Sequence, residues 1–215
     1  MFQQRISRVF DVLRIVNYPH PVLRYVSRPV TEIDDGLKEI VRSMFQLLYA
    51  AKGVGLAANQ VALPFRFFVL NLSADAAQPE KEQVFINPVI TKRHLSVEDE
   101  EGCLSIPGIH VDVRRAKKIR FQAYDLTGNL IDYEADELFS RAVQHETDHL
   151  DGKLIIDYFE PLDLRENQAK LRELELQHLK AQAGGELLSD QMIVEQLAAM
   201  QRPSGVDLNN GKTSA

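Results

Sequence analysis

The sequence QHETDH at residues 144–149 constrains the fold of this chain more than any other feature. It lies in a predicted helix over about Asp136 to Leu150. Residues four apart lie on the same face of a helix, so His145 and His149 can bind one cation together. Glu146 is offset around the helix, and its side chain can reach water beside that cation rather than the cation itself. The pattern therefore predicts a helix that binds a metal ion.

Apolar neighbours indicate that the face with the two histidines is buried. Leu138 and Ala142 lie one to two turns before His145 on about the same face. The alternative is a polar helix face that carries two histidines and two acids by chance. Buried imidazoles need a partner, and a metal ion meets that need. A catalytic metal normally has three protein ligands and one open position, so a third ligand is expected elsewhere in the chain.

The residues alone leave two sources of the third ligand open. Cys103, in EGCLSIPG at residues 101–108, is the only cysteine of the chain. A lone cysteine is often no more than a small buried hydrophobic residue. The other source is the set of acids downstream of the helix, as in an ordinary zinc protease: Asp157, Glu160 and Glu166.

A further segment, GVGLAANQ at residues 53–60, follows the first long helix. We expect Gly53 to end that helix in a left-handed conformation. Ala57 and Ala58 are small enough for a backbone to approach closely, and Gln60 offers an uncharged amide donor. No Gly-Lys-Ser/Thr sequence follows, which excludes a phosphate-binding loop of that type.

Hydrophobic periodicity predicts an α+β fold. Apolar residues recur at helical spacing over about Glu32 to Ala51, and Thr31 or Asp34 could cap that helix. Strand signals dominate the middle of the chain, and residues 125–129 are typical of a hairpin connection. We therefore expect antiparallel strands packed around the central metal-binding helix, with a C-terminal helical extension. The predicted strands are Phe65 to Leu72, Val84 to Ile90, Val111 to Tyr124 and Leu130 to Tyr133.

The character of the chain changes near Pro161, which suggests a catalytic domain at residues 1–160 and a C-terminal extension at residues 161–215. Asp163 with Glu166 three residues later is typical of a helix cap. The extension is predicted to contain a charged helix to about Gln182, a weaker helix from about Ser189 to Met200, and a disordered tail from Pro203 to Ala215.

Composition and charge argue against several classes of protein. The net charge is −6, so nothing globally basic favours nucleic acid or an anionic membrane. A single cysteine excludes an intramolecular disulfide, and no apolar stretch approaches the roughly 20 residues that span a bilayer. The N-terminal residues lack the apolar region of a signal peptide, although Arg5 and Arg8 precede any acid, as in an organelle transit peptide. We expect a soluble, cytoplasmic protein, with import into an organelle left open.

Together, GVGLAANQ, EGCLS and QHETDHLDG resemble the three motifs of the peptide deformylase family, in the same order. The opening sequence NYPHPVLRYVSRPV is similar to the start of that family, and the resemblance covers about Arg14 to Asp157. Three motifs in register are highly specific. The resemblance implies a metal-dependent hydrolase that removes the N-terminal formyl group from the formyl-methionine of newly synthesised polypeptides and releases formate.

The resemblance also implies the composition of the metal centre. Cys103, His145 and His149 would bind one divalent metal ion, with water or hydroxide at the fourth position. Two imidazoles and a thiolate suit Zn²⁺ but are also accepted by Fe²⁺, Co²⁺ and Ni²⁺. The resemblance favours Fe²⁺ as the native metal.

Further positions match the catalytic and substrate-binding positions of the family. Glu146 would act as the general base and then as the acid. The side chain of Gln60 and the backbone N–H of Leu104 would stabilise the oxyanion. Positions beside the substrate and its methionine side chain are matched by Val54, Gly55, Leu138 and Ala142.

Glu101 is expected to support the metal centre from outside. Arg114 or Arg115 on the next strand could pair with it and hold Cys103 in place. The alternative is an ordinary surface ion pair, which contributes roughly 0–1 kcal/mol.

Two other functions compete with the hydrolase. A zinc endopeptidase would use the same helix with a downstream carboxylate ligand. A non-catalytic homologue would bind formylated chain ends, or a partner through its tail, yet binding alone would not require Glu146. The tail helix could contact the ribosome or a second copy of the chain, but its nearly balanced charges favour a solvated helix packed on its own body.

Overall fold

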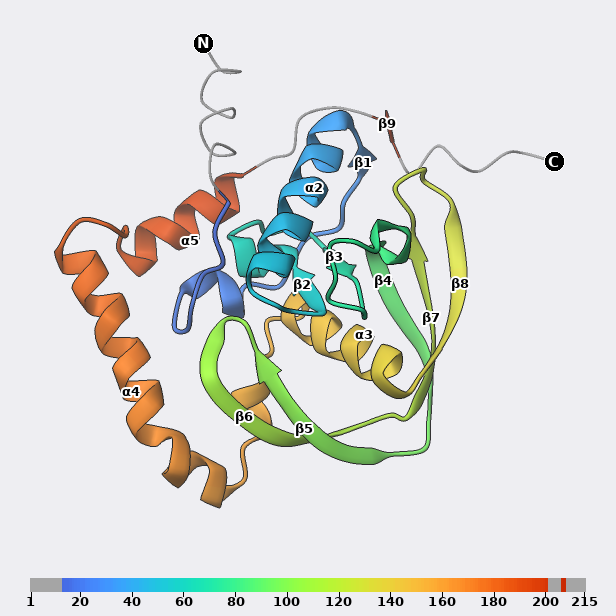
Figure 1. The fold of residues 1–215 in the computed structure, drawn as a ribbon. Helices are drawn as coiled ribbons and strands as arrows, with labels where there is room; N and C mark the ends of the chain where they lie inside the picture. Colours follow the sequence, from blue (N-terminus) through green and yellow to red (C-terminus); the bar gives the residue numbers. More distant parts are fainter. Residues whose placement is uncertain (1–12, 201–205, 208–215) are drawn as a thin grey trace, which may run out of the picture.

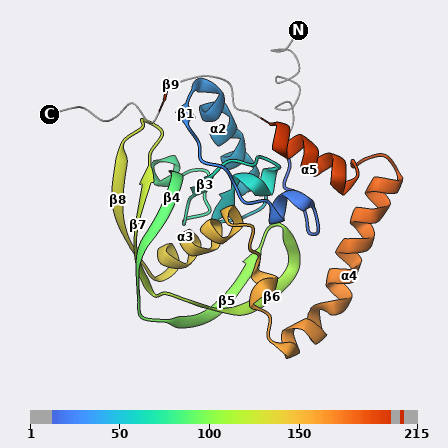
Figure 2. The same ribbon diagram turned by 180° about the vertical axis from the view of Figure 1, so that it is seen from behind.

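The structure, a computed structural model, describes residues 13–200 and 206–207 and has the predicted α+β fold (Figures 1 and 2). Helix α3 (Glu137–Leu150) lies at the centre of the body, with a five-stranded antiparallel sheet on one side. A two-stranded hairpin, β5 (Val97–Cys103) and β6 (Ile106–Arg115), lies on another side. The predicted arrangement of antiparallel strands around a central helix is confirmed.

The large sheet has the strand order β2-β3-β4-β7-β8, and all neighbouring strands are antiparallel. Phe85 packs against Phe68, Phe121 and Tyr133 with ring centroids 5.1 to 5.3 Å apart. These rings form one cluster with apolar side chains of α3, and so fix the helix on the sheet. The strands are β2 (Gly55–Ala57), β3 (Phe67–Leu70), β4 (Gln83–His94), β7 (Lys118–Tyr124) and β8 (Leu130–Asp136).

The sequence does not predict β5, because VEDEEGC lacks alternating apolar residues. The prediction of one strand over residues 111–124 is wrong, because β6 and β7 belong to different sheets. Gln144 fixes the break between them. Its Nε2 donates to the Ala116 carbonyl (2.8 Å), and its Oε1 accepts from the Ala116 N–H (3.1 Å). A side chain far along the chain therefore decides where β6 ends.

Helix α2 (Asp35–Ala50) is capped by Asp34, whose side chain accepts a hydrogen bond from the Leu37 N–H at 2.8 Å. The expected left-handed residue after this helix is Lys52, with φ 55°, so the prediction for Gly53 is wrong. Gly53 is required for space instead: a Cβ there would lie 2.7 Å from Leu104 and 2.9 Å from Leu48.

The C-terminal part contains α4 (Pro161–Ala183) and α5 (Asp190–Ala199). The Glu160 N–H donates to Asp163 Oδ2 at 2.8 Å, so α4 starts before the predicted cap at Asp163 and Glu166, and that prediction is wrong. The disorder predicted for 203–215 is also wrong for β9 (Val206–Asp207), which pairs with β1 (Glu32–Ile33). The rest of that tail lies outside the described residues.

Within the described residues, four short 3₁₀ helices connect the larger elements: η1 (Pro21–Arg24), η2 (Ala58–Val61), η3 (Pro79–Lys81) and η4 (Ile155–Tyr158). Within the described ranges, no helix combines the length and the apolar sequence that crossing a membrane requires.

Candidate metal centre and substrate pocket

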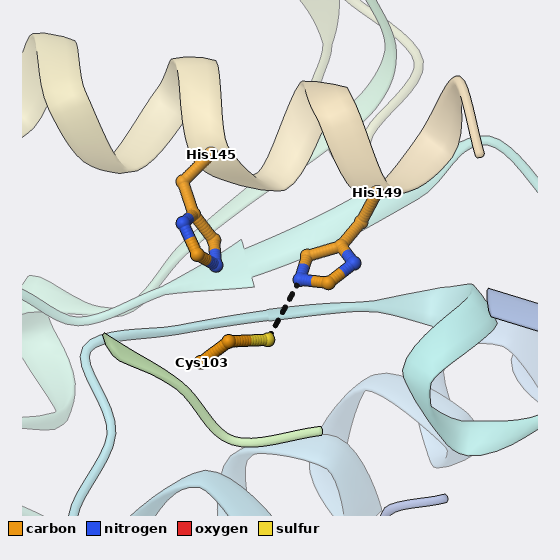
Figure 3. Close-up of side chains that lie close together, drawn as sticks. All are labelled: Cys103, His145 and His149. Carbon is orange, nitrogen blue, oxygen red and sulfur yellow. Dashed lines mark hydrogen bonds between the residues drawn. The ribbon is translucent and has the colours of Figure 1, made fainter. Parts of the chain in front are cut away.

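Three predicted ligands converge between α3 and the end of β5 (Figure 3). The ligand atoms of Cys103, His145 and His149 all lie within 4.8 Å of one another. Cys103 Sγ is 3.2 Å from His149 Nε2, and the two imidazole rings lie edge to face with centroids 5.0 Å apart. The helix supplies two of the ligands because four residues separate them, and the hairpin brings the third.

The environment of this group fits a divalent cation. Cys103 is 8% exposed and His149 is 1% exposed. Burial holds the pKa of His149 well below its usual value, so its ring is neutral and can donate a lone pair. Burial also acts to lower the pKa of His145, but contacts with Cys103 and Glu101 outweigh it and raise the pKa to about 10. The surroundings therefore favour positive charge between these side chains, which a thiolate- and imidazole-binding metal would supply.

Glu101 contacts the helix of the two histidines directly. Its Oε2 lies 2.9 Å from His145 Nδ1, which leaves His145 Nε2 free to face the centre. Arg115 binds both carboxylate oxygens at 2.5 and 2.9 Å, whereas Arg114 pairs with the exposed Glu98. Burial acts to raise the pKa of Glu101, but the hydrogen bonds from His145 and Arg115 outweigh it and lower the pKa to about 2. Of the two arginines suggested by the sequence, Arg115 is the partner.

Three members of this charge network are missed by reasoning from the sequence. Arg141 Nη1 donates to Glu101 Oε1 at 2.6 Å, and Asp148 Oδ2 accepts from Arg115 (2.7 Å) and from the Tyr158 hydroxyl (2.6 Å). Spacing offers one usable signal, because Arg141 lies four residues before His145 and so shares its helix face. A buried arginine needs a charged partner, and Glu101 provides it.

Glu146 lies beside the three ligands and is 4% exposed. Its Oε2 is buried without a hydrogen-bond partner among the described residues. Burial raises the pKa of this carboxyl to about 7. Gly55 leaves room for it, since a Cβ on Gly55 would lie 2.4 Å from Glu146 Oε1. The result is a carboxyl group that can gain or lose a proton near neutral pH.

Two potential hydrogen-bond donors lie on the other side of the ligands. Gln60 Oε1 accepts from the Ala57 N–H at 2.8 Å, which orients the amide. Gln60 Nε2 then lies 3.7 Å from Cys103 Sγ and 3.2 Å from Ser105 Oγ. Leu104 follows Cys103 in the turn between β5 and β6 and lines the adjacent cavity.

A cavity of about 480 Å³ opens beside these groups. Ala142 and Gly55 are buried in its wall, and Leu138, which is 52% exposed, lies at its rim. All four residues that the sequence places near a substrate line this cavity: Val54, Gly55, Leu138 and Ala142. It is also lined by Cys103, His145, Glu146 and Gln60.

The downstream acids do not join the metal centre. Both carboxylate oxygens of Asp157 are bound by Arg24, at 2.5 and 2.8 Å. Glu160 and Glu166 lie at the start of α4 and are exposed. In the part of the chain that the structure describes, Cys103, His145 and His149 form the only group of three or more His, Cys, Asp or Glu side chains that could hold a metal ion. The arrangement of an ordinary zinc protease is not formed.

Comparisons with known proteins agree with this geometry. The polypeptide deformylase family model matches residues 12–165. A peptide deformylase of Rhodopirellula baltica is 39% identical over 86% of this chain and 92% of its own length. One of Alkalilimnicola ehrlichii is 43% identical over 76% of this chain and 90% of its own length. The crystal structure of the Plasmodium falciparum peptide deformylase has a TM-score of 0.75 at 40% identity, covering 78% of this chain and 98% of that one. The chain belongs to the peptide deformylase family of enzymes.

Proposed function

We propose that this enzyme is a metal-dependent hydrolase that removes the N-terminal formyl group from the formyl-methionine of newly synthesised polypeptides and releases formate. One observation carries the proposal. Three ligand atoms that lie within 4.8 Å of one another stand beside a buried carboxyl group, in the wall of a cavity of about 480 Å³. At one place, the three ligands can bind a metal, the carboxyl group can accept and donate a proton, and the cavity can hold an apolar side chain.

Cys103, His145 and His149 would hold the metal. Bound there, a divalent ion would polarise the formyl carbonyl and lower the pKa of water toward neutrality. Family resemblance favours Fe²⁺, while Zn²⁺, Ni²⁺ and Co²⁺ fit the same donor atoms. With iron and an oxidisable thiolate, activity should be lost in air and regained with Ni²⁺ or Co²⁺. An air-stable enzyme that is fully active only with zinc would contradict the iron assignment.

Glu146 would move the protons of the reaction. Its buried carboxylate accepts a proton from the attacking water and then passes a proton to the nitrogen of the departing amine. A carboxyl group with a pKa of about 7 can do both near neutral pH. Glycine at position 55 leaves room for the Glu146 carboxylate beside the cavity, since a Cβ there would lie 2.4 Å from Oε1.

Gln60 and Leu104 would stabilise the tetrahedral intermediate. The Gln60 Nε2–H and the Leu104 backbone N–H can both donate to an oxyanion formed beside Cys103. Since the Ala57 N–H already orients the Gln60 amide, this donor needs no rearrangement during the reaction. Loss of one such donor typically lowers kcat by about 10²–10³.

The cavity would select the substrate. Val54, Leu138 and Ala142 offer an apolar wall for the methionine side chain. Strand β2 is an edge strand of the large sheet, so its free edge can pair with the backbone of an extended peptide. Gly55 and Cys103 would form a close wall around the formyl carbon, which carries only hydrogen where acetyl carries a methyl group.

Formate release from a formyl-Met peptide tests the proposal. The wild-type enzyme should release formate, and Cys103→Ala should lose both the metal and the activity. A zinc endopeptidase would keep its metal in Cys103→Ala, and a non-catalytic homologue would bind the peptide without releasing formate. Acetyl-Met peptides should react far more slowly. Equal rates for acetyl and formyl peptides would contradict the proposed wall.

The setting of the reaction is also a proposal. Formylated chain ends emerge during translation, so we place the enzyme in the cytoplasm, where α4 could contact the ribosome. Exposed apolar side chains on α4 support such a contact: Leu162, Leu164, Leu176 and Leu179. Co-sedimentation with ribosomes tests it, with a variant that replaces these four leucines by Ser as the control.

A further inference from the structure

Helix α4 packs on β6 and helix α5 packs on η1, on the same side of the body (Figures 1 and 2). Leu174 of α4 and Ile193 and Leu197 of α5 are 3 to 6% exposed. They belong to the same apolar cluster as Cys103 and Ile106. The two helices thus share a core with a metal ligand, although they follow the region of the three motifs in the sequence.

One route from these helices to the metal centre passes through β6. Helix α4 packs on β6, which begins at Ile106, only three residues after Cys103. A Cβ on Gly108 would lie 3.4 Å from the side chain of Lys170, so the start of β6 is in close contact with α4. Ile106 and Ile109 are buried in the shared cluster. Movement of α4 would therefore reach the turn that follows Cys103.

A second route passes through the N-terminal stretch. Helix α5 packs on η1, which follows the stretch Val16–Tyr18. The Val16 N–H donates to the Gln60 carbonyl and the Tyr18 N–H to the Ser105 carbonyl, each at 2.9 Å. The Tyr18 hydroxyl also donates to Glu175 of α4 at 3.2 Å. This stretch links the segment of Gln60 to the turn after Cys103. The Tyr18 hydroxyl attaches it to α4, and α5 packs on the 3₁₀ helix that follows it.

The two helices are themselves fixed in place. Arg28 donates to the carbonyls of Leu197 (2.9 Å), Ala198 (3.4 Å) and Met200 at the end of α5. A cation in this position satisfies free carbonyl groups and the negative end of the helix dipole. Between the helices, His178 Nε2 lies 2.8 Å from Asp190 Oδ1. The pair is therefore a rigid unit attached to the body at several points.

We propose that α4 and α5 are a brace for the thiolate ligand, with Leu174, Ile193 and Leu197 as positioning residues for metal retention. The inference rests on the proposed function, since it takes Cys103, His145 and His149 as the ligands. The histidines are set by one helix, whereas Cys103 is the last residue of β5, at a shift in the register of the hairpin and directly before its turn. Without the brace the turn would sample other conformations, the sulfur would leave the metal more often, and the metal would dissociate faster.

The test uses the full-length protein loaded with Co²⁺. Leu197→Ala and Leu174→Ala should weaken the thiolate-to-cobalt absorption band and speed metal loss to a chelator by about tenfold, the lower end of the range for groups that support metal ligands. Leu197→Met should restore both. Ile193→Val removes a single carbon and gives a milder version of the same change if an alanine variant fails to fold.

Two control variants separate positioning from general stability. Leu37→Ala truncates a fully buried side chain of α2 in a different apolar cluster, and should lower the free energy of unfolding without changing the cobalt spectrum. Leu176→Ala removes a leucine of α4 that is 51% exposed, and should change neither.

The outcomes are distinguishable. Wild-type spectra and metal-loss rates in folded Leu197→Ala and Leu174→Ala would overturn the brace and leave the proposed function standing. An equal acceleration of metal loss in Leu37→Ala would also overturn it, because general destabilisation would then explain the effect. A wild-type protein with no thiolate band would overturn the proposed function, and this inference with it.

Discussion

Helices α3 and α4 are both rich in charged and polar residues, yet they are buried to very different degrees. Nine of the 14 residues of α3 are buried, including Arg141, Glu146 and His149. Only Leu174 and His178 are buried among the 23 residues of α4. Buried polar groups are unfavourable unless they find partners, so those of α3 must satisfy one another or a ligand. The comparison of α3 with α4 shows that buried polar residues indicate a functional site, whereas exposed polar residues indicate only a helix face in contact with water.

The largest expected effect is on kcat, and it should distinguish a substitution of a buried acid of α3 from a substitution of an exposed acid of α4. Glu146→Gln removes the group proposed to move protons, and should lower kcat for formyl-Met peptides by about 10²–10⁴. Metal content should stay at the wild-type level. Glu166→Gln on α4 is the matched control and should leave the rate unchanged, since this side chain is exposed. Wild-type activity in Glu146→Gln would break the comparison.

The next effect concerns the support of His145. Glu101→Ala removes the carboxylate that Arg115, Arg141 and His145 share, and should weaken metal binding by about 10–100-fold in a chelator competition. Glu101→Gln, which keeps the shape and one acceptor oxygen, should give an intermediate value. Glu98→Ala on the same strand breaks only an exposed pair and serves as the control. Unchanged metal content in Glu101→Ala would reject the supporting role.

A smaller effect is expected on the pH dependence of folding stability, which tests the contact between the N-terminal stretch and α4. Burial and the nearby His178 lower the pKa of His20 to about 4 from 6.5, with Asp190 acting in the opposite direction and Arg14 in the same one. The unfolded chain therefore binds a proton at a pH where the folded protein does not. Stability should fall as the pH drops below 6.5, by about 2 kcal/mol at pH 5.

Asparagine at this position isolates the contribution of His20. In the folded protein the Val22 N–H donates a hydrogen bond to His20 Nδ1 at 3.3 Å. The side chain in His20→Asn does not titrate but keeps an acceptor for this bond. Urea unfolding between pH 7.5 and pH 5 should show a shallower loss of stability in the variant. Identical slopes in the two proteins would show that His20 titrates normally.

The smallest effect is expected on the solvated surface of α4. Lys170 and Glu173 form an ion pair at 2.9 Å with side chains 39% and 53% exposed. Glu173→Ala should change the free energy of unfolding by less than about 1 kcal/mol, because exposed pairs are screened by water. A larger loss of unfolding free energy, measured by urea unfolding, would mean that this exposed face of α4 makes a substantial contribution to stability.

The two histidines of the candidate metal centre were open to prediction because their signals are local. Two histidines four residues apart need only a helix to meet, and the helix itself follows from periodicity and ends near Gly152. Cys103 is different, because the motif resemblance selects it rather than any spacing. The roles of all these residues in the reaction stay predictions until the variants above are measured.

Features that depend on contacts between distant segments could not be predicted in the same way. Strand β5 has an acidic sequence that resembles a loop, and Glu101 within it is buried only because Arg115 and Arg141 neutralise it. The break between β6 and β7 depends on the amide of Gln144. The division of the chain at residue 160 also stays a prediction, and the shared core of α4, α5 and Cys103 argues that the two parts are not independent.

The hydrogen bonds from Arg28 to the end of α5 have a consequence for the folding of the chain during its synthesis. The guanidinium and the Leu197 carbonyl are 169 positions apart, so Arg28 leaves the ribosomal exit tunnel well before its partner does. Contacts of such long sequence separation form slowly and late. A nascent copy of this chain cannot form these bonds until Leu197 has been synthesised and has also left the tunnel.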